Sequence, residues 1–429
     1  MSSMRAEAGL DRPLHLIDGH NLALSQGTGI ATYARGMAAA LDGLGASHGI
    51  VGGADPGRST RPGRVGGALR LVRRLALRGG IAWRGGLPLR QDTPDCPMPA
   101  GLPPGGASFT ARDCFGLAHL GLRAGGGMLE LLPEGRPPAV MHWTYPTALH
   151  LKGAPNLYSV LDLIPLLMPE TVLMDIPLHR RLLGLIAARA DHIVTISEWS
   201  RRDIIRELGV AEDRVTNTWL AVDPDPEALA MPPDRIAALL GRHGLSSQGY
   251  FLFFAAIEPR KNLRRLIEAH LASGVAAPLI VVGKKAWLWE RELEALAGRE
   301  NSPDGRVRLL GHLPRAELMA LVRGARAACF PSLYEGFGLP ALEAMALGTP
   351  VLTSTASCMP EVVADAAMCV DPLSVQAMAE ALRALDQGAE LRARLAAAGP
   401  GRAAFFSAAA YRERLGMLLG RLGLHPGAH

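Results

Sequence analysis

The chain has 429 residues, of which 48% are hydrophobic and 20% are charged, and this length is too great for one ordinary hydrophobic core. The net charge of +5 and the pI near 9.1 favour anionic partners, such as nucleotide diphosphates or acidic lipid surfaces. The sequence lacks zinc-type cysteine spacing, an aromatic-rich RNA motif and a basic helix followed by heptads, so we expect no nucleic-acid partner.

The first predicted strand is Leu14-His15-Leu16-Ile17-Asp18. A glycine loop that contains Gly27 and Gly29 follows, and an amphipathic helix is predicted from about residue 31 to 44. A strand, a glycine loop and a helix in this order can place backbone amides beside a phosphate. A plain turn is the alternative interpretation of these residues.

Residues from about 52 to 106 interrupt the alternation of strands and helices. They are rich in Gly, Pro and Arg, and the segment from Arg58 to Arg90 contains many arginines and no acidic residue. Apolar residues recur at helical spacing between Arg64 and Arg78, a pattern typical of a helix on an anionic membrane surface. A solvated face in an insertion is the alternative, and both interpretations stay open.

Two further strands with their loops are predicted within residues 140–145 and 156–165, and another strand is predicted at 192–197. Ser197 is the predicted N-cap of a helix from Glu198 to Leu208. Strands that alternate with helices predict a parallel sheet with helices on both faces. The predicted domains are 1–222 and 248–405, joined by a linker of residues 223–247. Residues 406–429 form a C-terminal helical segment that we expect to cross back to the first domain.

The five cysteines are scattered and odd in number, which argues against a disulfide framework and for a reducing compartment. Residues 1–18 contain acidic side chains and no apolar core of the signal-peptide type. No run reaches the ~18 apolar residues of a membrane span. We therefore expect a cytoplasmic protein, either free or peripheral on the inner face of the cell membrane.

The most informative segment contains two glutamates, Glu335 and Glu343, with seven residues between them. Residues 325–330 predict a buried strand, and a helix is predicted to begin at Pro340 and to end near Gly348. Glu335 therefore falls at the carboxyl end of a strand, where open α/β sheets bind ligands. Glu343 lies about one turn into the helix.

The loop between these glutamates suits a phosphorylated sugar. Gly336 and Gly338 allow backbone amides to approach a ligand, and the N-terminus of a helix favours an anion. One carboxylate can accept hydrogen bonds from sugar hydroxyls, and the other can accept them from a ribose diol. Two solvated glutamates on a helix are the alternative interpretation.

A second motif, Glu258-Pro259-Arg260-Lys261-Asn262, follows the predicted strand of residues 250–255. Arg260 and Lys261 at a strand end, beside the N-terminus of a helix, form a suitable clamp for a diphosphate. Asn262 is the predicted cap of that helix. A helix start with two solvated cations is the alternative.

Together these motifs resemble those of a known family, the retaining glycosyltransferases of the GT4 type (glycosyl transferases group 1), whose E-x7-E motif matches Glu335 and Glu343. The likeness is strong over about residues 250–375, weaker over 27–35 and 141–208, and absent over the arginine-rich insertion. It implies an α/β protein with the GT-B fold, in which two Rossmann-like parallel-sheet domains face a central cleft. The first domain would bind the acceptor and the second the nucleotide sugar.

By this resemblance, Glu335 orients the donor sugar, Glu343 holds the ribose, and Arg260 and Lys261 neutralise charge on the leaving diphosphate. Glu335, Lys261 and Arg260 are thus the expected catalytic residues. The other expected donor-binding residues are Gly27, Gly29, Gly311, Gly336, Phe337, Gly338 and Leu339. The sequence has no D-x-D-type metal motif, so we expect neither a metal ion nor another cofactor.

One departure from the family lies at Leu161, where many relatives carry a histidine that contacts the donor sugar. A leucine cannot donate a hydrogen bond or move a proton. His142 is a candidate substitute from the neighbouring strand end, although an ordinary buried histidine is the more frequent case. Asp162 either orients its loop or contacts the acceptor.

The resemblance implies transfer with retention at the anomeric carbon, by likeness to bacterial mannosyltransferases. GDP-mannose is the first expected donor, with glucose or N-acetylglucosamine on a uridine carrier as the alternative. The expected acceptor is a saccharide or a polyprenyl-diphosphate-linked glycan. Two other functions stay open, a catalytically silent sugar-nucleotide-binding scaffold at a membrane assembly site and a GT-B-fold sugar-nucleotide epimerase. The complete set of clamp residues favours the enzyme.

Overall fold

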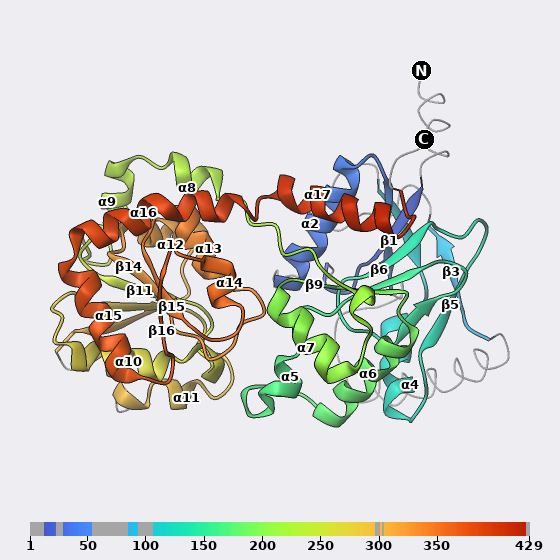
Figure 1. Cartoon of the computed structure of the whole chain (residues 1–429), viewed down its shortest axis with the longest axis horizontal. Helices are drawn as coiled ribbons and strands as arrows, with labels where there is room; N and C mark the ends of the chain where they lie inside the picture. Colours follow the sequence, from blue (N-terminus) through green and yellow to red (C-terminus); the bar gives the residue numbers. More distant parts are fainter. Residues whose placement is uncertain are drawn as a thin grey trace, which may run out of the picture.

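The computed structural model describes residues 13–22, 29–53, 85–92, 106–296, 301–302 and 304–425. These residues form two α/β units that lie side by side, each built on one sheet (Figure 1). The first unit is coloured blue to green and the second mainly yellow to red. Gly27 and the basic helix predicted over residues 64–78 lie outside the described residues.

The sheet of the first unit has ten strands in the order β10-β9-β8-β6-β1-β2-β4-β3-β5-β7. Neighbouring strands are parallel except for the antiparallel pair β3 and β4. The strands are β1 (Leu14–Asp18), β2 (Ser47–Gly52), β3 (Leu87–Gln91), β4 (Ala107–Thr110), β5 (Leu129–Pro133), β6 (Val140–Trp143), β7 (Leu149–Leu151), β8 (Asn156–Ser159), β9 (His192–Thr195) and β10 (Val215–Asn217).

The position of β3 corrects one prediction. This strand lies inside the segment that we expected to interrupt the α/β alternation, yet it pairs with both β4 and β5. Leu87 and Leu89 are buried while Arg90 is exposed, which is the alternation of a half-buried strand. The sequence did not predict this strand, because a proline lies between its two leucines. Glycines and arginines also flank them.

The helical segments of the first unit connect these strands. They are α2 (Gly29–Gly43), α4 (Cys114–Arg123), α5 (Ile164–Leu167), η1 (Pro169–Thr171), α6 (Ile176–Arg189), α7 (Glu198–Leu208) and η2 (Glu212–Arg214). The predicted cap of α7 is confirmed, since the Ser197 side chain accepts a hydrogen bond from the backbone N–H of Ser200.

The sheet of the second unit has six parallel strands in the order β13-β12-β11-β14-β15-β16. Numbered within this unit, the order is 3-2-1-4-5-6, that of a Rossmann fold, and its direction reverses between β11 and β14. The strands are β11 (Phe251–Phe254), β12 (Leu279–Val282), β13 (Val307–Gly311), β14 (Ala327–Phe330), β15 (Val351–Ser354) and β16 (Met368–Val370).

Helices cover both faces of this second sheet. Phe251 and Phe253 of β11 join one hydrophobic core, and Leu252 and Phe254 join another, so the strand is buried on both faces. The helical segments are η3 (Pro259–Lys261), α10 (Leu263–Ser273), α11 (Trp289–Glu292), η4 (Glu294–Leu296), α12 (Arg315–Gly324), α13 (Leu339–Ala346), α14 (Met359–Val363), α15 (Val375–Gln387) and α16 (Ala389–Ala404).

The chain passes between the two units twice. After β10 it enters α8 (Pro226–Ala230) and α9 (Pro233–Gly241), which pack against α12 of the second unit. After α16 it returns through α17 (Ala408–Arg421), which packs against α2 of the first unit (Figure 1). Among the described residues, no helix combines the length and the hydropathy that a membrane span requires.

Candidate functional site

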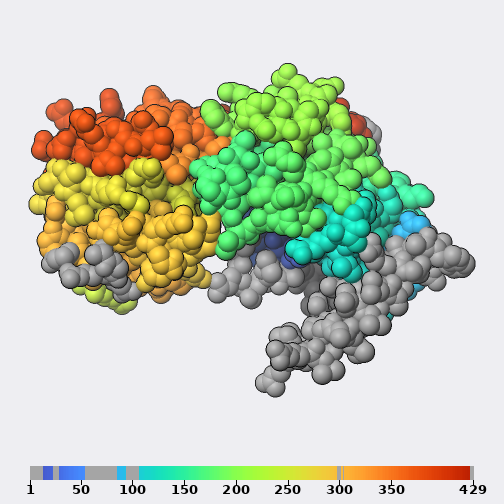
Figure 2. Space-filling model, turned by 90° about the horizontal axis from the view of Figure 1, so that it is seen from below, coloured from blue at the N-terminus to red at the C-terminus, as the bar shows by residue number. Residues whose placement is uncertain are grey.

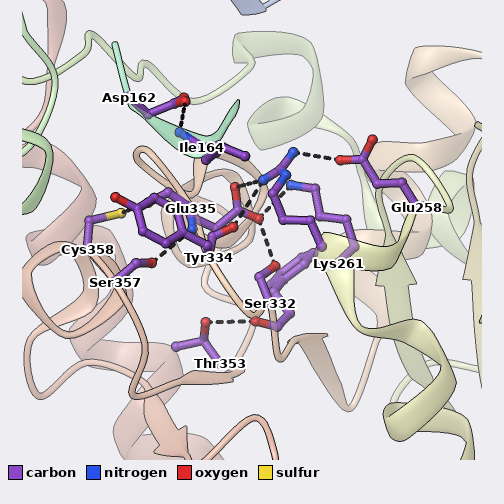
Figure 3. A network of polar contacts seen from close by, with 12 residues as sticks. Asp162, Ile164, Glu258, Lys261, Ser332, Tyr334, Glu335, Thr353, Ser357 and Cys358 are labelled. Carbon is purple, nitrogen blue, oxygen red and sulfur yellow. Dashed lines mark hydrogen bonds and ion pairs between the residues drawn. The ribbon is translucent and has the colours of Figure 1, made fainter. Parts of the chain in front are cut away.

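The predicted site lies at the point where the strand order of the second sheet reverses. β11 leads into η3 with Arg260 and Lys261, and the neighbouring strand β14 leads into the loop with Glu335. Because parallel neighbours end at the same edge of a sheet, both loops meet there, and ligands bind in such crevices. Figure 3 shows this cluster from close by.

Glu335 is the centre of the cluster. Its Oε2 lies 2.7 Å from Nη1 of Arg260, and its Oε1 lies 2.6 Å from Nζ of Lys261 (Figure 3). The hydroxyl of Ser332 also donates to Oε1, at 2.7 Å. The structure therefore brings the three predicted catalytic residues together.

The Glu335 side chain is only 11% exposed, yet its carboxylate is ionised. Burial acts to raise its pKa, but the charges of Lys261 and Arg260 and the hydrogen bonds from Lys261 and Ser332 outweigh burial and hold the pKa at about 2. An ionised carboxylate accepts hydrogen bonds and donates none, so this group is suited to receive sugar hydroxyls.

Arg260 is fixed by more than one carboxylate. Its Nη2 lies 2.6 Å from Oε1 of Glu258, and its Nη1 also donates to the backbone oxygen of Tyr334 at 3.2 Å. Burial works to lower the pKa of the guanidinium, but the charges of Glu335, Glu258 and Asp162 raise it. The cation is thus held in one orientation before any ligand binds.

Asn262 does not act as the predicted cap. It occupies the N-cap position of α10 with φ at 60°, but its side chain makes no capping hydrogen bond. Instead, Nδ2 donates to the backbone oxygens of Pro331 at 2.9 Å and Pro372 at 2.7 Å. The side chain therefore ties the loops that follow β14 and β16 to the start of α10.

Two residues that the sequence analysis missed hold the backbone of Glu335. The Glu335 N–H donates to Oγ of Ser357 at 2.9 Å, and Sγ of Cys358 donates to the Glu335 carbonyl oxygen at 3.1 Å. Both residues directly precede α14 (Figure 3). Their position after β15 was the available signal, since this strand is parallel to β14 and ends at the same edge of the sheet.

The two glycines of the loop are required for different reasons. A Cβ atom on Gly336 would lie 2.9 Å from Oδ2 of Asp162, whereas Gly338 has φ at 91° and a Cβ atom there would lie 2.7 Å from the Met359 sulfur. Phe337 between them is buried and packs edge-on against Phe406, with ring centroids 5.2 Å apart. These contacts let the loop turn sharply into α13.

Asp162 reaches the site from the first unit. The contact with Gly336 places its carboxylate against the Glu335 loop, and the Ile164 N–H donates to Oδ1 at 3.0 Å (Figure 3). Burial raises the pKa of Asp162, against the hydrogen bond from Ile164 and the charge of Arg260. The site therefore has walls from both units.

The other residues that the sequence predicts to bind the donor have separate surroundings. Glu343 projects from α13 and pairs with Arg315 at 3.0 Å, with a side chain 29% exposed. Gly311 ends β13, two strands from β11 on the same edge. Gly29 begins α2 and, with Leu339 of the second unit, lines a cavity of about 520 Å³.

His142 lies away from the cluster. It is buried in β6, and its Nε2 lies 3.1 Å from Nδ1 of His15, with the two rings stacked. These are the surroundings of a buried histidine, the alternative interpretation, and the contacts found for His142 are with His15. Within the described part of the chain, no three His, Cys, Asp or Glu side chains form a group that could hold a metal ion.

Comparison with known proteins supports the family resemblance. Residues 242–402 match the family described as Glycosyl transferases group 1. The chain is 38% identical over 194 residues to the O-antigen chain mannosyltransferase B of Escherichia coli, covering 43% of the chain and 49% of that protein. It is 32% identical over 239 residues to the MMP alpha-(1->4)-mannosyltransferase of Mycolicibacterium hassiacum, covering 50% of the chain and 52% of that protein. The chain thus spans about half the length of these relatives.

Solved structures extend the likeness to both units. The sucrose-phosphate synthase of Thermosynechococcus elongatus is similar with a TM-score of 0.65 at 18% identity, over 96% of this chain and 99% of that one. HepE of Anabaena, solved in complex with UDP-glucose, is similar with a TM-score of 0.63 at 16% identity, over 95% of this chain and 100% of that one. At such identities the likeness shows the fold alone, and the predicted GT-B architecture is confirmed.

Proposed function

We propose that this chain, whose residues 242–402 form a glycosyl transferases group 1 domain, transfers a sugar from a nucleotide-diphosphate donor to a saccharide or lipid-linked acceptor. The observation that carries the proposal is Glu335, held ionised by Arg260 and Lys261 at the switch point of a Rossmann-type sheet. The similar mannosyltransferases favour mannose as the sugar and GDP-mannose as the donor.

The cations would stabilise the leaving group. Negative charge grows on the diphosphate as the glycosidic bond breaks, and we propose that Arg260 and Lys261, which flank Glu335, neutralise that charge. The N-terminus of α13 adds the favourable end of a helix dipole. These groups supply the electrostatic role that a metal ion has in other transferases, so we propose that no metal is needed.

The sugar would lie between Glu335 and the first unit. Glu335 would accept hydrogen bonds from sugar hydroxyls, while the acceptor would approach from the side of Asp162. We propose retention by attack on the same face from which the diphosphate leaves, with the departing phosphate taking the acceptor proton. No covalent bond to the protein is then required.

A lipid-linked acceptor would bring the chain to the inner face of the cell membrane. The net charge of +5 and the acid-free arginine-rich stretch from Arg58 to Arg90 support an anionic surface as a further partner. Peripheral attachment is therefore part of the proposal.

The first test is calorimetric titration with GDP, UDP, GDP-mannose and UDP-glucose without added metal. We expect one nucleotide class to bind, and we expect Lys261→Ala to weaken that binding by about tenfold or more, because a charge-assisted contact to phosphate is lost. Lys152→Ala is the matched control, since Lys152 is exposed in the first unit and should leave the affinity unchanged.

Binding alone does not separate a transferase from a scaffold or an epimerase. Acceptor-dependent release of the nucleoside diphosphate would identify transfer, and conversion of the donor without an acceptor would identify the epimerase. Binding of none of the four nucleotides would contradict the proposed function, as would full affinity in Lys261→Ala.

A further inference from the structure

Helix α7 of the first unit contacts the second unit beside the loop that contains Glu335. The hydroxyl of Tyr334, the residue before Glu335, donates a hydrogen bond to Oδ2 of Asp203 in the middle of α7. Asp203 is buried, and its other oxygen accepts from Arg206 at 2.5 Å. Figure 2 shows the green segment of the first unit, which includes α7, against the orange part of the second.

The second contact lies at the N-terminus of α7. The carboxylate of Glu361, in α14 of the second unit, accepts hydrogen bonds from the backbone N–H of Glu198 at 2.7 Å and of Trp199 at 3.1 Å. A carboxylate from one unit therefore caps a helix of the other, where the helix dipole favours negative charge. Trp219 Nε1 donates to the same carboxylate at 3.0 Å.

Tyr334 and Glu361, which make these two contacts, are close in the chain to residues that bind Glu335. Tyr334 adjoins Glu335 and also accepts from Arg260 through its backbone oxygen. Glu361 lies in the short helix that follows Ser357 and Cys358, which bind the Glu335 backbone. The main chain at Glu361 is itself anchored, because Arg402 donates to its carbonyl oxygen at 2.5 Å.

These contacts matter because they join α7 of the first unit to two segments of the second unit. Asp203 lies about one helical turn after the N-terminus of α7, so both segments contact the N-terminal half of this helix. Hydrogen bonds to a charged group are worth more than neutral ones, and Asp203 is buried where an unmet acceptor is costly. Separation of the units would break together the bond from Tyr334 to Asp203 and the bonds that the Glu361 carboxylate accepts.

We propose that α7 is a latch that holds the two units closed and sets the Glu335 loop for transfer. Asp203, Tyr334 and Glu361 are positioning residues, because they act through Glu335 and its neighbours and do not contact the reacting atoms. The catalytic part of this inference rests on the proposed function, while the conformational part does not.

Two variants test the latch independently. Tyr334→Phe removes only the hydroxyl that reaches Asp203, and Glu361→Gln removes the charge and one of the two accepting oxygens. Glu212→Gln is the matched control, because this carboxylate is 75% exposed and pairs with Arg201 of α7. The measurements are the radius of gyration from small-angle X-ray scattering, the calorimetric Kd for the nucleoside diphosphate, and kcat and KM for transfer.

We expect both variants to increase the radius of gyration and to lower kcat about tenfold, while the nucleotide Kd changes less than about threefold, since the cations of the second unit are intact. An unchanged radius and an unchanged kcat in both variants would overturn the proposal, even if the melting temperature fell. If Tyr334→Phe does not fold, Glu361→Gln decides. A wild-type chain without turnover would remove the proposed function, whereas the scattering comparison would still test the latch.

Discussion

At the scale of single residues, Glu335 is buried and its carboxylate is nevertheless ionised. Two cations and one hydroxyl converge on its carboxylate within 2.7 Å. The cations depend on it in turn, because Arg260 and Lys261 are themselves only 18% and 12% exposed. Loss of one partner from a buried ion pair leaves an uncompensated charge, which costs about 3–5 kcal/mol.

We therefore predict that Glu335→Gln lowers both activity and stability. Gln keeps the size of the side chain but removes the charge that pairs with Lys261 and leaves Arg260 paired with Glu258 alone, so the free energy of unfolding should fall by about 3 kcal/mol. Transfer should fall by about 100-fold or more, as for a lost electrostatic contact in an active site. Urea unfolding and initial rates measure the two effects.

Glu343→Gln is the control for stability. Its ion pair with Arg315 involves side chains that are 29% and 53% exposed, and such pairs contribute about 0–1 kcal/mol. Equal loss of stability in the two variants would contradict the account of Glu335 as a buried charge centre.

The sequence predicted this centre because its members follow neighbouring strands of one sheet. It did not predict the contact of Tyr334 with Asp203, which are 131 residues apart in the chain and belong to different units. Such a pair depends on how the units dock, and a tyrosine hydroxyl has no characteristic spacing. For the same reason the sequence did not predict that Glu361 caps α7.

At the scale of elements, the centre of the first sheet contains a buried histidine pair. His15 of β1 and His142 of β6 lie on neighbouring strands, and neither is more than 2% exposed. Burial lowers the pKa of His15 to about 4 and lowers that of His142 well below its usual value, with the charge of His15 acting in the same direction. Both imidazoles are therefore neutral in the folded chain at neutral pH.

We predict that this pair makes the fold acid-sensitive. Below pH 6.5 the unfolded chain binds protons at these imidazoles while the folded chain does not until about pH 4, so stability falls as the pH decreases through this window. His15 alone should account for a loss on the order of 3 kcal/mol by pH 4. Urea unfolding at pH 7, 6, 5.5 and 5 measures the slope.

A comparison of histidine variants separates the effect of the pair on stability from the effect of Asp18. Burial raises the pKa of Asp18 to about 6, so its protonation stabilises the folded chain as the pH falls and opposes the histidines. His15→Asn should make the slope less steep, and His312→Gln, at an exposed position, should leave it unchanged. A wild-type slope in His15→Asn would argue against the pair as the cause.

The elements that the sequence predicted are those with long apolar runs or clear caps. β1 was predicted with its observed bounds, and α7 was predicted with its Ser197 cap. The short strands β3, β4, β5 and β7 were missed, because they have three to five residues and polar or proline positions within or beside them. These segments are strands because their backbones pair with neighbouring strands. Sequence periodicity does not report such pairing.

At the scale of the whole molecule, aromatic side chains join the two units at the junction. Phe406 is fully buried and packs against Phe337 of the Glu335 loop and against Trp219, which precedes the first passage between units. Its carbonyl oxygen also accepts from the N–H of Val222 at 2.7 Å. Phe406 thus connects both passages of the chain to the candidate site.

We predict that Phe406→Ala destabilises the protein by about 3–5 kcal/mol, the usual cost of removing a buried phenyl ring. The cavity should also loosen Phe337 and reduce transfer, although no substrate contact is removed. Differential scanning calorimetry and initial rates measure both effects. Phe405→Ala is the control, since Phe405 is 42% exposed and should cost less, and an equal loss in both variants would contradict the role of Phe406.

The return of α17 to the first unit has a consequence for how the protein is made. Tyr411 of α17 is buried against Tyr33 of α2, so the first unit is completed by residues that the ribosome adds about 365 positions after the end of α2. During synthesis, residues 226–404 can assemble around their own sheet while α2 still exposes the surface that α17 will cover. The unit that is translated first is therefore finished last, and a chain that stops before residue 408 would release a first unit with an uncovered apolar face.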